Sequence, residues 1–137
     1  MPVVLVVDDD EFMQRMLRTV LEQEGFSVAC AYNGAKAIEH IKQHEIDIVV
    51  TDMIMPGGNG LSFIRELKGV KPNMPVIAMS GGIDGVGRRG TSDLDICGAY
   101  GVNYLLPKPF EPKELISAIR SELNNQIDFT PQIERGR

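Results

Sequence analysis

The sequence predicts an α/β domain in which helices cover both faces of a doubly wound parallel sheet. Short β-branched runs alternate with stretches of helical periodicity along the chain. Two of these runs, Val3 to Val7 and Ile48 to Val50, are apolar at every position, as expected of strands that meet no water on either face. The length of 137 residues fits one compact core rather than two packed domains.

The strands of the sheet are expected where β-branched and other apolar residues cluster, because such side chains pack well on a pleated surface. In chain order these runs are Val3 to Val7, Ser27 to Ala29, Ile46 to Thr51, Val76 to Met79 and Asn103 to Leu106.

The first helix is expected directly after the first strand. Its apolar residues recur at i, i+3, i+4, i+7 and i+8, on one helix face: Met13, Met16, Leu17, Val20 and Leu21. Asp10 precedes this pattern and is expected to cap the helix, and Gly25 marks its end. We expect Gln14, Arg15 and Arg18 on its surface, as docking groups for a partner.

Later helices are predicted by the same spacing in three places, around Ile38, Ile64 and Ile119. The predicted domain spans residues 1–125. Residues 126–137 lose the periodicity and are expected to form a flexible C-terminal tail. The segment Gly81 to Thr91, in which five of eleven residues are glycine, predicts a mobile loop that serves either as a partner surface or as a tolerated insertion.

Composition excludes several classes of function. The chain has 14 Lys and Arg against 19 Asp and Glu, a net charge of −5, which does not favour direct binding to nucleic acid. The first apolar run has no basic residue before it and ends at three aspartates, so it predicts neither a signal peptide nor a membrane span, and the cytoplasm is the expected compartment. Cys30 and Cys97 form no metal or redox motif and are expected to be free thiols.

Polar side chains follow four strands at their carboxyl ends. Asp8 and Asp9 follow the first strand, Asp52 the third, Ser80 the fourth and Lys108 the fifth. The carboxyl ends of parallel strands meet at one edge of a sheet, where such folds bind ligands. Carboxylates about 5 Å apart repel one another by about 3 kcal/mol per pair at an effective dielectric constant near 20, so a cation must compensate them. An all-oxygen ligand set favours Mg²⁺, and the whole set predicts a phosphoryl-transfer site.

Four motifs in this order resemble the receiver domain of two-component response regulators, over about residues 1–125. They are the run Val6 to Asp9, the run Asp52 to Pro56 with Gly60 behind it, the strand Val76 to Met79 ending in Ser80, and Lys108 to Phe110. The resemblance implies a flavodoxin-like, three-layer α/β/α fold with five parallel strands in the order 2-1-3-4-5.

The resemblance also implies the roles of the acidic residues. It makes Asp52 the phosphoacceptor, and it assigns Mg²⁺ to Asp9 and Asp52, with Asp8 helping directly or through water. The main-chain carbonyl of Ile54 is implied as a further ligand.

Three implications concern the residues around the phosphoryl group. The resemblance implies that Ser80 donates a hydrogen bond to a phosphoryl oxygen and that Lys108 pairs with the phosphorylated aspartate. It further implies a cis peptide between Lys108 and Pro109, which only an X-Pro bond tolerates at low cost.

The partners implied are a sensor histidine kinase or a histidine phosphotransfer protein as donor. The implied role is that of a phosphoacceptor signalling domain, not an enzyme, that promotes its own Mg²⁺-dependent phosphorylation and dephosphorylation. Because no effector domain is evident, we expect a stand-alone receiver that signals through another, unidentified protein, as a monomer or weak homodimer.

One position departs from the family pattern. Three residues before the lysine, where many receivers carry a switch Tyr or Phe, this chain has Leu105, and its tyrosine is Tyr104. Strand alternation is expected to point these two side chains to opposite faces.

Two other functions are alternatives for the same residues. Asp8 and Asp10 after an apolar strand, with Ser80 and Lys108 later, also fit a phosphatase of the haloacid dehalogenase type, with Asp8 as nucleophile; Asp52 would then have no role. A pseudo-receiver that only binds partners would leave a costly acidic cluster unused.

Two further motifs match known binding patterns but are not interpreted as binding sites. The run Gly85 to Gly90 matches G-x-G-x-x-G but does not follow the first strand of a βαβ unit. His40 and His44 have the i, i+4 spacing of zinc proteases, but Ile41 stands where the catalytic Glu would be, and a solvated helix face is the expected setting.

Overall fold

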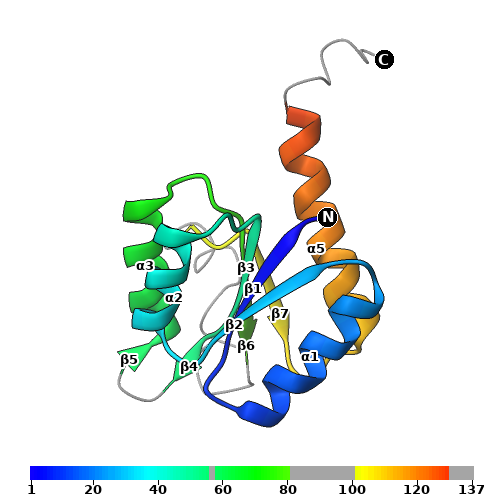
Figure 1. The fold of residues 1–137 in the computed structure, drawn as a ribbon, viewed down its shortest axis with the longest axis horizontal. Helices are drawn as coiled ribbons and strands as arrows, with labels where there is room; N and C mark the ends of the chain where they lie inside the picture. Colours follow the sequence, from blue (N-terminus) through cyan, green and yellow to red (C-terminus); the bar gives the residue numbers. More distant parts are fainter. Residues whose placement is uncertain (56–57, 81–100, 130–137) are drawn as a thin grey trace.

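The protein is described here by a computed structural model that covers residues 1–55, 58–80 and 101–129 (Figure 1). Its first half contains β1 (Val3–Val7), α1 (Glu11–Gln23), β2 (Ser27–Ala31), α2 (Gly34–Gln43) and β3 (Ile48–Asp52). Its second half contains β4 (Ile54–Met55), β5 (Gly58–Asn59), α3 (Gly60–Val70), β6 (Val76–Ser80), β7 (Tyr104–Pro107) and α5 (Pro112–Phe129).

The main sheet has five strands in the order β2-β1-β3-β6-β7, and every neighbouring pair is parallel. Counted along the chain without the small β4–β5 hairpin, this is the order 2-1-3-4-5. The predicted flavodoxin-like, doubly wound fold is therefore confirmed. The hairpin, which is antiparallel, was not predicted, since two-residue strands leave no periodic pattern.

Helices cover both faces of the sheet, with α2 and α3 on one side and α1 and α5 on the other (Figure 1). Alternate residues of a strand contribute to two separate cores. In β3, Val49 packs with residues of α2 and α3, whereas Ile48 and Val50 pack with residues of α1 and α5. Every residue of β3 and β6 is buried, which explains why the central strands are continuously apolar until their carboxyl ends.

The start of α1 has the predicted cap. The Asp10 carboxylate accepts hydrogen bonds from the backbone N–H groups of Phe12, at 2.9 Å, and Met13, at 3.4 Å. After the helix, Gly25 adopts a φ of +95°, which L side chains rarely reach, and turns the chain into β2. The cap fixes where α1 begins and thereby positions the loop that carries the acidic pair, and the glycine fixes where the chain leaves the helix.

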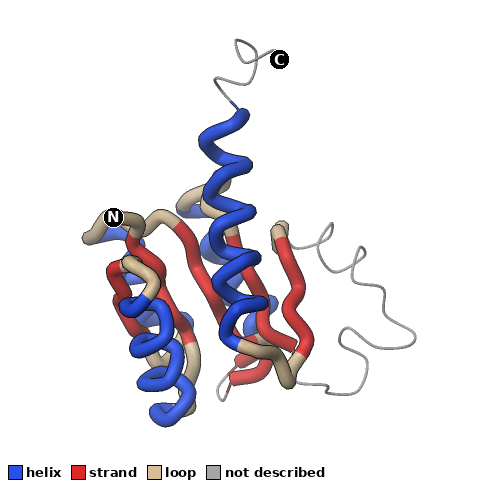
Figure 2. The backbone as a smooth tube through the Cα atoms, turned by 90° about the vertical axis from the view of Figure 1, so that its right-hand side faces the viewer, coloured by secondary structure: helices blue, strands red, loops and turns tan. Residues whose placement is uncertain are grey.

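The last helix runs past the predicted domain boundary. α5 ends at Phe129, four residues beyond residue 125, and its last turns extend past the strands (Figure 2). Asn124, Asn125 and Gln126 interrupt the apolar pattern after Leu123, but the backbone hydrogen bonds of the helix continue through these polar residues. The division into a domain and a tail stays a prediction.

Several sequence predictions lie outside the described residues. They concern the loop Gly81 to Thr91, the G-x-G-x-x-G run within it, Cys97, and the tail from residue 130 onward. Across the described ranges, none of the helices has the length and apolar character needed to cross a membrane.

Candidate functional site

Three carboxylates meet at the carboxyl edge of the sheet. β1 and β3 are neighbours, with Val7 beside Thr51, so the residues that follow in each strand emerge side by side. One oxygen from each of Asp8, Asp9 and Asp52 lies within 4.8 Å of the other two. The predicted convergence of these three acids is confirmed, and the site is built from the ends of two adjacent strands.

The three acids differ in burial. Asp8 is 1% exposed and Asp52 is 8% exposed, whereas Asp9 is exposed. The pKa of Asp8 is raised to about 6, chiefly by burial and in smaller part by the charges of Asp52 and Asp9, while a hydrogen bond from the Asp10 N–H and the charge of Lys108 oppose the rise. Within the described residues, Oδ2 of Asp8 has no hydrogen-bond partner.

Lys108 supplies a positive charge to this cluster. Its ammonium lies 3.4 Å from Oδ2 of Asp52, and both side chains are largely covered. The lysine is positioned by the end of β7, where its backbone N–H donates to the carbonyl of Ser80 at 2.6 Å. The peptide between Lys108 and Pro109 is cis, as the resemblance implied.

Ser80 is the last residue of β6 and is 2% exposed. β6 is the neighbour of β3, with Met79 beside Asp52, so Ser80 lies one residue beyond the level of the aspartate. The backbone of β6 and β3 is further joined by the Met53 N–H, which donates to the carbonyl of Met79 at 3.0 Å. All the side chains predicted for the site therefore emerge at one edge.

Ile54 lies two residues after Asp52, in β4, where it pairs with Asn59 of β5. The hairpin holds this main chain next to the end of β3. Pro56 of the same motif is outside the described residues. The role of the Ile54 carbonyl stays a prediction.

Gln14 lies inside the molecule, contrary to the prediction that places it on the surface of α1. Expected on the surface, it is 2% exposed, and its Nε2 donates to the carbonyls of Ala31 (2.7 Å), Asp8 (2.9 Å) and Val6 (3.3 Å). The amide thus ties α1 to the ends of β1 and β2 beside the acidic cluster. Its position three residues before Leu17 and seven before Leu21 puts it on the buried face, and this spacing was the signal that could have identified it.

The two residues at the position of the family's aromatic switch face opposite ways, as predicted. Leu105 is 8% exposed and belongs to the core beneath α2 and α3. Tyr104 is 42% exposed, and Leu106, on the same side of the strand as Tyr104, packs in the other core. An aliphatic side chain therefore occupies the inner position.

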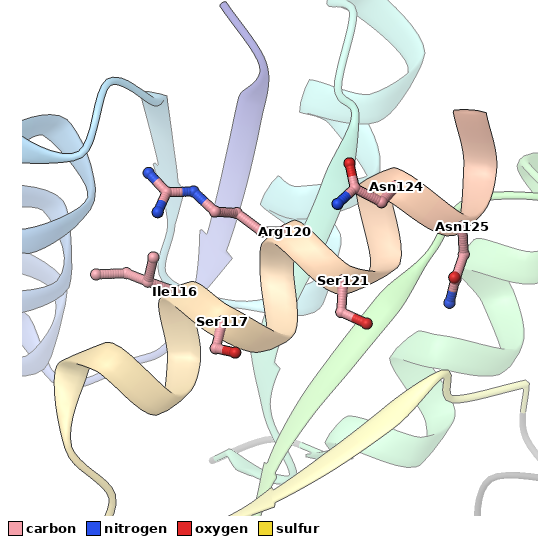
Figure 3. A pocket seen from close by; sticks show the side chains of 6 residues that line it. All are labelled: Ile116, Ser117, Arg120, Ser121, Asn124 and Asn125. Carbon is pink, nitrogen blue, oxygen red and sulfur yellow. The ribbon is translucent and has the colours of Figure 1, made fainter. Parts of the chain in front are cut away.

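Hollows elsewhere on the molecule do not coincide with the acidic cluster. One of about 450 Å³ lies along α5, with Ile116, Ser117, Arg120, Ser121, Asn124 and Asn125 among its lining residues (Figure 3). Arg120 turns away from the two serines, and it donates to the carboxylate of Glu24 at 3.0 Å and lies over the ring of Phe26. This contact joins α5 to the end of α1.

Comparison with known proteins agrees with this geometry. The family model described as response regulator receiver domain matches residues 4–120. The chain belongs to the response regulator receiver family. Receiver domains are the phosphoacceptor signalling modules of two-component systems, and they bind Mg²⁺ at an acidic pocket. In this chain the cluster of Asp8, Asp9 and Asp52 could hold a metal ion.

The most similar curated sequences include the DNA-binding response regulator MtrA of Mycobacterium tuberculosis and of Mycobacterium leprae. Each is 32% identical over 125 residues, which cover 91% of this chain and 52% of the relative. The receiver chain thus spans about half the length of these relatives.

Solved receiver structures share the fold. A receiver domain from Clostridium thermocellum has a TM-score of 0.80 and 27% identity, covering 95% of this chain and all (100%) of that one. The receiver domain of the Francisella response regulator 1452 has a TM-score of 0.80 and 28% identity, and the match covers 92% of this chain and 99% of that one. A CheY-like receiver from Methanospirillum hungatei matches the fold at a TM-score of 0.82 with 21% identity, and the match covers 93% of this chain and 98% of that one.

Proposed function

We propose that this receiver accepts a phosphoryl group on Asp52, in a Mg²⁺-dependent transfer from a phosphohistidine. The observation that carries the proposal is the ion pair of Asp52 with Lys108, at 3.4 Å, next to two further carboxylates. A carboxylate surrounded in this way has an acid cluster for the metal and an ammonium for the phosphoryl charge.

The residues present fit Mg²⁺. Three carboxylates offer oxygens within 4.8 Å of one another, and the buried Oδ2 of Asp8 lacks a partner among the described residues. We assign the metal to Asp8, Asp9 and Asp52, with the main-chain carbonyl of Ile54 as a further ligand. When bound, Mg²⁺ supplies charge neutralisation for the oxygens of the transferring phosphoryl group.

The chain's own residues account for the rest of the chemistry. An oxygen of Asp52 forms a bond to phosphorus as the P–N bond of the phosphohistidine breaks, and the leaving imidazole takes up a proton. Lys108 pairs with a phosphoryl oxygen in the acyl phosphate, and the hydroxyl of Ser80 donates to another. Hydrolysis of the bond between the Asp52 oxygen and phosphorus returns the domain to its unphosphorylated state. The receiver therefore promotes both its own phosphorylation and its own dephosphorylation.

The donor is proposed to be a sensor histidine kinase or a histidine phosphotransfer protein. Two exposed aromatic side chains offer an apolar rim for it: Phe12, 74% exposed, and Tyr32, 50% exposed. Phe12 follows the acidic loop in the first turn of α1. Tyr32 follows Ala31, whose carbonyl accepts from the Asp8 N–H, so both residues flank the site. We place this encounter in the cytoplasm.

The output is proposed to pass through a protein partner that binds the phosphorylated receiver. The receiver itself is proposed to be a monomer or a weak homodimer. The MtrA relatives are described as DNA-binding, but the present chain matches 52% of their length, and its net charge of −5 does not favour nucleic acid. Since Leu105 replaces the usual aromatic residue, the change of state is proposed to involve repacking of this aliphatic side chain.

Phosphate release from acetyl phosphate separates this proposal from the phosphatase alternative. With Mg²⁺, wild type should release phosphate only through an adduct on Asp52, so Asp52→Asn should abolish release. A phosphatase with Asp8 as nucleophile would keep turning over in Asp52→Asn and stop in Asp8→Asn. A pseudo-receiver would show neither adduct nor release.

A further inference from the structure

His40 and His44 lie one turn apart at the end of α2, at the opposite end of the sheet from the acidic cluster. Their ring centroids are 5.4 Å apart and the ring planes are tilted by 40°. His44 is the C-cap of the helix, and its backbone N–H donates to the carbonyl of His40 at 2.8 Å. The two imidazoles are therefore held near each other by the backbone of the last turn.

The environment of His40 is not that of a solvated surface histidine. The side chain is half-buried, and its Nδ1 is fully buried without a hydrogen-bond partner in the part of the chain that the structure describes. Leaving a buried polar atom unpaired costs about 1–3 kcal/mol.

Both rings line one hollow. It has a volume of about 410 Å³, and its described lining residues are Val3, Ala29, His40, His44, Glu45 and Ile46. The aliphatic members make an apolar wall, while the two imidazoles and the exposed carboxylate of Glu45 are its polar groups. Val3 begins β1, whereas Asp8 follows the end of β1, which separates this hollow from the acidic cluster by the length of the strand.

We propose that His40 and His44 bind a divalent transition-metal ion of the Zn²⁺ class. Two imidazoles at i, i+4 on a helix can ligate one ion, and imidazole selects Zn²⁺, Ni²⁺ or Cu²⁺ over Mg²⁺. The acidic cluster, with oxygen ligands alone, has the opposite preference. The bound ion bridges the last turn of α2 and ties it to the connection that leads into β3. The site is independent of the function proposed for Asp52.

Zn²⁺ binding to the full chain, followed by calorimetry and by NMR of the histidine side chains, tests the proposal. Cys30→Ser and Cys97→Ser remove competing thiols, and excess Mg²⁺ fills the acidic cluster. The sequence contains two histidines, so both imidazole signals are assignable. We expect one saturable Zn²⁺ that shifts both imidazoles and that remains in Asp52→Asn.

Variants locate the ligands. His40→Ala and His44→Ala should each weaken Zn²⁺ binding by more than about tenfold, since losing even an outer partner of a metal ligand costs that much. His44 is exposed, so its replacement leaves the fold intact and keeps the test valid if His40→Ala does not fold. Gln43→Ala, an exposed neighbour outside this hollow, is the matched control and should bind as wild type does. Zn²⁺ binding that survives His44→Ala, or that fails to saturate in wild type, would overturn the proposal.

Discussion

The ammonium of Lys108 lies 3.4 Å from Oδ2 of Asp52, although 56 positions separate the two residues in the chain. The contact spans three strands, because Asp52 ends β3, Lys108 follows β7, and β6 lies between them. One positive side chain therefore balances part of the charge of three carboxylates. This balance determines how the site should respond to mutation, to pH and to metal.

Removing the lysine charge should strengthen metal binding while it weakens phosphoryl transfer. In Lys108→Met, the acidic cluster loses a competing cation, and Mg²⁺ affinity should rise by up to about tenfold from Coulomb attraction at these distances. The yield of the phosphorylated form should fall because the phosphoryl charge loses its partner. Titration with Mg²⁺ and adduct yield, measured on the same preparation, check both. Lys113→Met, which removes an exposed lysine of α5, is the control, and equal effects of the two variants would contradict the account.

Asp8 should make folding stability depend on pH. Its pKa is raised from 3.8 to about 6 in the folded protein, so between these values the folded state retains a proton that the unfolded state has lost. The free energy of unfolding should therefore fall as pH rises from about 4 to about 6, by up to about 3 kcal/mol, and remain low above that range. Asp8→Asn should remove this loss.

Urea unfolding in the presence of a chelator checks the prediction. Asp8→Asn should be more stable than wild type at pH 7.5, a value above both of these pKa values, and as stable as wild type near pH 3.5, below both. Mg²⁺ should stabilise wild type at the higher pH only, because it binds the deprotonated carboxylate. A constant difference between the two proteins across this range would be inconsistent with a buried, titrating Asp8.

Gln14 should be needed for stability and for metal affinity. Gln14→Met keeps the volume but removes the donor to three buried carbonyls, at a cost of about 1–3 kcal/mol. Because one of those carbonyls belongs to Asp8, Mg²⁺ binding should weaken as well. Chemical unfolding and Mg²⁺ titration measure the two effects. Arg15→Met, at the exposed neighbouring position, should change stability by less than about 0.5 kcal/mol, and a Gln14→Met variant as stable as Arg15→Met would contradict this role.

Replacing Leu105 should destabilise the fold far more than replacing Tyr104. Leu105→Ala should lower the free energy of unfolding by about 2–5 kcal/mol, since the side chain is buried in the core beneath α2 and α3. Tyr104→Ala, at a half-exposed position on the other face, should cost far less. Thermal unfolding of both variants checks the prediction, and similar losses would show that the outward side chain also carries core packing.

Most of the site could be predicted because parallel strands bring their carboxyl ends to one edge. Asp8, Asp52 and Ser80 directly follow or end apolar runs, so their convergence required only the fold class. Asp10 was identifiable as a cap from its place before the helical pattern.

Gln14 was misplaced because a polar residue was assumed to lie on a solvated face, whereas its spacing to Leu17 places it inside. The half-burial of His40 was missed for a similar reason. Periodicity identifies the faces that are apolar, and it does not report a polar side chain that finds its partners in the ends of neighbouring strands. The short β4–β5 hairpin left no pattern at all.

The central claim is that Asp52 accepts the phosphoryl group, and intact mass spectrometry tests it most directly. Wild type and Asp52→Asn with Mg²⁺, and wild type without Mg²⁺, are incubated with acetyl phosphate, and their intact masses are measured. The account predicts the gain of one phosphoryl group by wild type with Mg²⁺ and by neither of the other two samples. A phosphoryl adduct that persists in Asp52→Asn, or an absence of adduct in wild type with Mg²⁺, would contradict it.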